Sequence, residues 1–167
     1  MHKKLRCYMI LDLLITIAAG TFMHYAYEWS GNSFLVGLIA PVNESTWEHM
    51  KLLFFPMLIS GIFLTCRLQE AYPNISAGLS VGLLLGTFLI PVLFYTYTGI
   101  LGFHLLWMDI AVFILSTLIA FIVSYYLTIT CYFKDCKPFL LLLILILMLC
   151  FFFFTVNPPQ IGIFQIP

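Results

Sequence analysis

The sequence predicts an all-α protein: a polytopic bundle of about five transmembrane helices, with the N-terminus in the cytoplasm and the C-terminus outside. Three observations predict it. The composition is too apolar for a soluble chain, five apolar runs can each cross a bilayer, and the basic residues gather on one side of the resulting topology. We therefore expect a single transmembrane domain over residues 1–167 in a multi-pass protein of the cell membrane.

The amino-acid composition indicates that the folded chain is surrounded by lipid. Of the 167 residues, 63% are hydrophobic and 8% are charged, against roughly 25% charged residues in a soluble domain. Folding removes only about 70% of the surface that a chain of this size exposes, so a water-soluble fold would leave much of this apolar surface in water. The lipid bilayer is the expected partner. Nothing points to nucleic acid, because the net charge is zero and the basic run at Lys3, Lys4 and Arg6 is short.

The first of the five spans follows that basic run. Apolar segments long enough for a core of about 30 Å lie near residues 8–26, 50–67, 77–97, 105–130 and 138–156. The first also resembles a signal peptide, because a charged start leads into an apolar centre and small residues. It continues through residues 21–23 and contains Asp12. We expect it to be retained, with Asp12 paired to Arg6 or to a neighbouring helix.

The next spans carry packing signals. Before the second, Ser45 and Glu48 have the spacing of a capping box, in which hydroxyl and carboxylate satisfy free N–H groups of a helix start. Pro56 in the second span and Pro91 in the third each free a carbonyl that a neighbour must satisfy. A structural role is expected for Ser45 and for the glycines of the third span, which recur every fourth residue and let another helix approach: Gly78, Gly82 and Gly86.

Basic residues orient the bundle. With the N-terminus inside, six of the seven are cytoplasmic: Lys3, Lys4, Arg6, Arg67, Lys134 and Lys137. Lys51 alone is outside, where we expect it to pair with Glu48 or to reach the lipid head groups. The positive-inside rule therefore favours an N-in, C-out arrangement.

Cysteines and tryptophans fit this orientation. The topology places Cys7, Cys66, Cys131 and Cys136 near the cytoplasmic face, where reducing conditions argue against disulfides. The three tryptophans, Trp29, Trp47 and Trp107, all fall at the outer face, as expected for an aromatic belt.

The few ionisable residues concentrate at the outer ends of three spans. His24 and Glu28 end the first span, Glu44, Glu48 and His49 open the second, and His104 and Asp109 open the fourth. Because charge in or near a bilayer is costly, such placement marks a functional site. His104 and Asp109 are five residues apart and diverge unless a helix starts between them.

Imidazole and carboxylate groups are ligands for a divalent metal such as zinc. The metal-ligand candidates are His24, Glu28, His49 and His104. The candidates for a catalytic base are Glu44, Glu48 and Asp109. A helix entry with good caps is the structural alternative for the segment that contains Ser45.

One segment of the chain carries a resemblance. His24, residues 27–29 and the run Pro-Val-Asn-Glu-Ser-Thr-Trp-Glu-His-Met-Lys at 41–51 look like the hallmarks of a family of small bacterial integral membrane proteins of unknown function. The resemblance extends over the whole chain. It implies membrane location and architecture and no particular chemistry.

Three functions are compatible with these observations. The first is an integral membrane protein of unknown biochemical role, whose outer His/Glu cluster binds a metal or a partner, either a second copy or another membrane protein. The alternative is a membrane-embedded, metal-dependent hydrolase that acts on a lipid or envelope substrate. The third is a small transporter subunit, which needs polar residues throughout the membrane.

Overall fold

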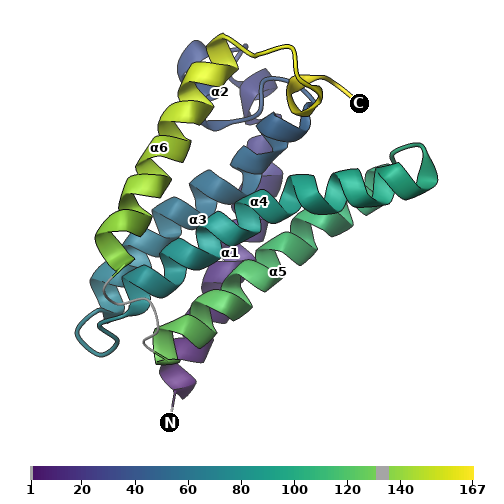
Figure 1. Cartoon of the computed structure of the whole chain (residues 1–167). Helices are drawn as coiled ribbons and strands as arrows, with labels where there is room; N and C mark the ends of the chain where they lie inside the picture. Colours follow the sequence, from purple (N-terminus) through teal and green to yellow (C-terminus); the bar gives the residue numbers. More distant parts are fainter. Residues whose placement is uncertain (1, 131–135) are drawn as a thin grey trace.

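The structure, a computed structural model, describes residues 2–130 and 136–167. Lys134 and Cys131, both predicted to be cytoplasmic, lie outside these residues. Within the described ranges the regular structure is entirely helical (Figure 1). In chain order the elements are α1 (Lys3–Trp29), α2 (Phe34–Ile39), α3 (Thr46–Leu68), α4 (Ile75–Leu101), α5 (Leu106–Thr130), α6 (Lys137–Val156) and the short 3₁₀ helix η2 (Gly162–Phe164).

Five of these helices are long and apolar enough to cross a membrane: α1, α3, α4, α5 and α6. They correspond to the five predicted spans. Helix α1 extends the predicted 8–26 at both ends, and α4 likewise extends 77–97, because the backbone hydrogen bonds continue beyond the apolar run into polar residues. The predicted connection 27–49 contains α2, which the apolar pattern did not reveal because it is only six residues long.

Successive long helices run in opposite directions (Figure 1). We call the two ends of the bundle the N-terminal end, which has the start of α1 and α6, and the C-terminal end, which has the loops 30–45 and 102–105 and the tail 157–167. Helices α4 and α5 form a long hairpin whose tip leans away from the start of α3, while α6 stands on the other side of α3 and α4 (Figure 1).

The predicted glycine stripe packs α4 against α5. A Cβ at Gly78 would lie 2.6 Å from the Thr128 hydroxyl, and one at Gly86 would lie 2.6 Å from the Ala120 methyl group. At Gly82 it would collide with the Ser124 hydroxyl and the Ala120 carbonyl. The facing residues of α5 also recur every fourth position, so two stripes of small residues bring the backbones together.

A second close approach joins α1 to α3. Pro56 has no N–H group, so the carbonyl of Leu52 has no helical donor four residues later. That carbonyl lies against Gly20 of α1, where a Cβ would collide with it. About two turns closer to the start of α1, the buried Asp12 lies beside Ser60 of α3, so it faces a neighbouring helix, one of the two partners that the sequence suggests.

Lys51 is fully buried, although it is the one basic residue at the C-terminal end among those the structure describes. Its Nζ donates to the Glu48 carboxylate at 2.7 Å, to the Gly37 carbonyl of α2 at 3.0 Å and to the Thr155 hydroxyl of α6. The expected pair with Glu48 is confirmed. It forms the centre of a network that joins α2, α3 and α6.

The predicted capping box forms only in part. The Ser45 hydroxyl accepts the N–H of Glu48 as the N-cap of α3. The Glu48 carboxylate reaches the N–H of Val42 at 3.0 Å instead of that of Ser45, whose N–H bonds the Asn43 side chain. Lys51 and Thr155 hold Glu48 inside the bundle, so its carboxylate meets the chain three residues earlier.

Trp47 corrects the predicted aromatic belt. It is 8% exposed and its ring packs against Phe151 and Phe154 of α6 and Phe164 of the tail. Trp29 and Trp107 are exposed, as a belt requires. The residues next to Trp47 in the sequence cannot reveal this difference, because the aromatic residues that contact Trp47 lie about a hundred positions later in the chain, in α6 and the tail.

Candidate functional site

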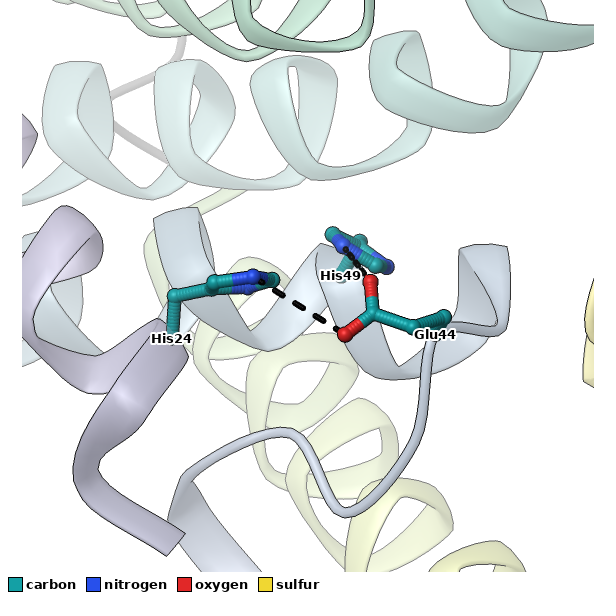
Figure 2. Close-up of side chains that lie close together, drawn as sticks. All are labelled: His24, Glu44 and His49. Carbon is teal, nitrogen blue, oxygen red and sulfur yellow. Dashed lines mark ion pairs between the residues drawn. The ribbon is translucent and has the colours of Figure 1, made fainter. Parts of the chain in front are cut away.

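Two of the predicted ligands, His24 and His49, meet Glu44, which was predicted as a catalytic base, at the C-terminal end of the bundle. His24 projects from the last turns of α1, Glu44 from the loop before α3, and His49 from the first turn of α3. Figure 2 shows the Glu44 carboxylate between the two imidazole rings. One nitrogen of each ring and one carboxylate oxygen lie within 4.8 Å of one another.

The distances are close to those of a metal centre. Nε2 of His49 lies 3.3 Å from one Glu44 oxygen, and Nε2 of His24 lies 3.8 Å from the other. In a tetrahedral zinc site with bonds of about 2.0–2.1 Å, neighbouring ligand atoms are roughly 3.3 Å apart. The His49–Glu44 distance matches this value. The His24–Glu44 distance is longer and goes to the other carboxylate oxygen, so the three donor atoms, now within 4.8 Å of one another, would have to move closer together around an ion.

The ring of His49 is oriented from behind. Its Nδ1 lies 2.9 Å from the backbone carbonyl of Ser45. A carbonyl only accepts hydrogen bonds, so Nδ1 carries a hydrogen, and Nε2, the ring nitrogen nearest to Glu44, is the one that can bind a metal ion through its lone pair. Histidines that bind metals usually donate their second N–H group in this way, which sets the tautomer and the ring plane.

The helix start of α3 therefore positions two ligands. Ser45 caps the helix through its side chain and orients His49 through its carbonyl. Glu44 is the residue immediately before the cap. The structural role predicted for Ser45 and the ligand role predicted for His49 are therefore compatible, because they use different atoms of one short segment.

The three ligands are accessible from one side. The side chains of His24 and His49 are 29% and 28% exposed, and that of Glu44 is 64% exposed. Two histidines and one glutamate form the ligand set of catalytic zinc sites, which leave a fourth position for water or a substrate, whereas structural sites close all four.

His24, Glu44 and His49 line a cavity of about 510 Å³. The cavity lies between α1, α3 and the hairpin of α4 and α5. Most of its wall is apolar, with contributions from Gly20, Leu52, Ile90, Phe94, Leu106, Ile110, Val112, Phe113 and Ile166. Its polar lining comprises the three ligands together with Thr21, Tyr25, Thr46, His104 and Asp109.

His104 and Asp109 form a second polar group on the hairpin side of this cavity. Helix α5 starts at Leu106, between the two residues, so their side chains meet with 3.3 Å between Nδ1 and Oδ2. Tyr97 of α4 donates its hydroxyl to the other Asp109 oxygen and accepts the N–H of Leu105 at 3.3 Å. Tyr97 was not among the predicted residues, because a tyrosine within an apolar span has no pattern that marks it.

Two predicted candidates lie elsewhere. Glu28 is exposed on the last turn of α1 and does not line the cavity, because its partner at the i, i+4 position, His24, turns toward Glu44. Glu48 belongs to the buried Lys51 network described above. Of the seven predicted ionisable candidates, five therefore line one cavity: His24, Glu44, His49, His104 and Asp109.

Three hydroxyl groups within the spans bond carbonyls of their own helices. Thr87 and Thr117 donate to carbonyls of their own helices at 2.7 and 2.8 Å, and Ser60 donates to the Met57 carbonyl at 3.4 Å. This is the usual behaviour of hydroxyls in apolar helices. It gives the transporter hypothesis no support.

These features define a class: an all-helical protein with five helices able to cross a membrane and a His/Glu cluster at one end of the bundle. Residues 1–166 match a family of unknown function, DUF6512, and the chain belongs to that family. The resemblance to a family of unknown function is thereby confirmed. No curated protein and no solved structure shows significant similarity to the chain.

Proposed function

We propose that the protein is a multi-pass membrane protein, with its N-terminus in the cytoplasm, that holds a divalent metal ion, most simply zinc, at its extracytoplasmic face. His24, Glu44 and His49 are the ligands. One observation carries the proposal: three donor atoms, from helix α1, the loop and helix α3, lie within 4.8 Å of one another. Nitrogen and carboxylate ligands in this combination suit zinc.

The charge distribution supports the orientation. Among the residues that the structure describes, the basic residues at the N-terminal end are Lys3, Lys4, Arg6, Arg67 and Lys137. Lys51 is at the other end, but the Glu48 carboxylate at 2.7 Å neutralises it inside the bundle. The positive-inside bias is therefore stronger than a simple count of residues indicates.

Metal analysis tests the site. We expect detergent-purified wild-type protein to bind one zinc ion per chain, and His24→Ala, Glu44→Gln and His49→Ala each to weaken binding at least about 100-fold. Loss of a direct ligand should cost no less than the roughly 10- to 100-fold that residues behind the ligands contribute. The measurement is zinc affinity by competition with a chelator, together with zinc content by mass spectrometry.

Matched controls come from the same chain. Glu28→Gln removes an exposed carboxylate one turn from His24, and His2→Ala removes a histidine that packs on Tyr72 at the N-terminal end. Both variants should keep the wild-type affinity. Equal zinc binding by wild type and by His49→Ala would refute the assigned site.

Labelling with an impermeant maleimide tests the orientation. Cys7, Cys66 and Cys136 are exposed at the N-terminal end, so in intact cells they should stay unlabelled until the membrane is permeabilised. A cysteine introduced as Gln160→Cys, in the exposed tail after α6, should react in intact cells. Labelling of the native cysteines from outside, with Gln160→Cys protected, would reverse the proposed topology.

A further inference from the structure

We propose that the cavity beside the metal site binds a single-chain lipid with an anionic oxygen head group. The head completes the coordination of the metal ion, and the alkyl chain lies among the apolar side chains of α1, α4 and α5. This inference rests on the proposed metal site and assigns a ligand class to it.

The cavity has the size and lining of a ligand site. Its volume of about 510 Å³ falls within the roughly 300–1,000 Å³ typical of small-molecule pockets. Ile90, Phe94, Ile110 and Phe113 provide an apolar wall, whereas the polar groups gather near the ligands and at Asp109. Such a division, polar at one part and apolar over the rest, is complementary to an amphiphile. The volume suits one alkyl chain better than the two chains of a phospholipid.

The cavity is continuous with the surface that would face lipid. Leu106 and Ile110 line it, and they are also 75% and 51% exposed. Phe103 and Trp107, beside them at the hairpin tip, are exposed as well. In a bilayer, exposed apolar side chains at the end of a span contact lipid. A lipid therefore reaches the cavity from the side, without its alkyl chain crossing water.

Charge determines the head group. A zinc ion bound by two neutral imidazoles and the Glu44 carboxylate keeps one net positive charge and one open position. An anionic oxygen fills the position and neutralises the charge. The Asp109 carboxylate, on the hairpin side, already has partners within the protein, because Tyr97 donates to one of its oxygens and His104 Nδ1 lies 3.3 Å from the other.

Native mass spectrometry of zinc-loaded protein in detergent tests this inference. The probes are oleate, oleoyl lysophosphatidate and monoolein, which share one chain and differ in the head group. We expect at least one of the two anionic lipids to bind at a 1:1 ratio and at least ten times more tightly than monoolein. The order of oleate and lysophosphatidate decides between a carboxylate and a phosphate head. Removal of zinc with a chelator should weaken the binding at least tenfold.

A pair of isoleucines on α5 provides the matched variants. Ile110→Trp places a large ring at the cavity wall and should weaken lipid binding at least tenfold while zinc content stays at wild-type level. Ile114→Trp makes the same change one turn away, at an exposed position that does not line the cavity, and should bind like wild type.

The outcomes separate the two proposals. Full zinc content without binding of either anionic lipid, equal binding of monoolein, or equal binding by the two tryptophan variants would overturn the lipid site alone. Absence of zinc from the wild-type protein would overturn the metal site, and this inference with it.

Discussion

Replacing Lys51 with methionine is expected to lower the free energy of unfolding by about 3–5 kcal/mol, the usual cost of removing one partner from a buried ion pair. Lys51→Met leaves the Glu48 carboxylate almost fully buried. The remaining donors are the N–H of Val42 and the Thr155 hydroxyl, neither of which carries a charge. The connection between α2, α3 and α6 is lost at the same time.

A double substitution separates the buried charge from lost packing. In Glu48→Gln/Lys51→Met, the glutamine oxygen can still accept from the N–H of Val42, and its amide nitrogen can donate to the Thr155 hydroxyl, which in turn donates to the Phe151 carbonyl. No charge then remains inside. We therefore expect the double variant to be more stable than Lys51→Met alone. The measurement is equilibrium unfolding in detergent, with the exposed Lys4→Met as a control that should stay within about 0.5 kcal/mol of wild type. Additive losses from the two single substitutions would contradict a coupled pair.

Gly82→Leu is expected to have the second large effect, with a loss greater than the roughly 1–3 kcal/mol of ordinary overpacking. A Cβ at Gly82 meets the Ser124 hydroxyl and the Ala120 carbonyl. The carbonyl belongs to the backbone of α5, so only separation of α4 from α5 relieves the collision.

Gly99→Leu in the same helix is the matched control. A Cβ there meets no atom within 4 Å. Leucine forms helices better than glycine by nearly 1 kcal/mol, so this variant should be neutral or slightly stabilised. Thermal unfolding of the two variants side by side checks the prediction, and similar melting temperatures would exclude close packing at Gly82.

Much of this fold is predictable from the sequence, because the length of an apolar segment can be counted along the chain without any knowledge of tertiary contacts. The five long helices and the glycine stripe at Gly78, Gly82 and Gly86 need only the spacing of residues along the chain. The residues of α5 that pack against this stripe are harder to predict from the sequence. Ala120 and Ser124 become recognisable as its complement only when α5 is known to lie against α4.

The sequence predicts at which end of the bundle the candidate site lies, but it does not predict which of the ionisable residues belong to it. Depth in the bilayer brought His24, Glu44 and His49 to the same end of the bundle, and the structure places them together. The same reasoning also selected Glu48. The direction of the Glu48 side chain depends on its contacts with Lys51 and Thr155. Thr155 is more than a hundred residues away in the sequence, so the residues around Glu48 do not predict this contact. Glu28 was selected by its spacing from His24, but the His24 ring faces Glu44.

The buried network and the candidate metal site both depend on one short segment. Between residues 44 and 51, Glu44 and His49 face the cavity, whereas Glu48 and Lys51 lie on the other side of the helix start and contact α6. The run Pro-Val-Asn-Glu-Ser-Thr-Trp-Glu-His-Met-Lys therefore combines a helix cap, a structural ion pair and two ligands. In the sequence these residues form one continuous segment. Only the structure shows that they lie on two different sides of the start of α3.

The central claim, a zinc ion held by His24, Glu44 and His49, is tested most directly by the X-ray absorption spectrum of the purified protein at the zinc edge. We expect a first shell of nitrogen and oxygen atoms only, at about 2.0–2.2 Å, with the outer-shell scattering of two imidazole rings. That scattering should be reduced in His49→Ala. A sulfur shell at about 2.3 Å, which would indicate cysteine ligands, or a spectrum without imidazole scattering would contradict it.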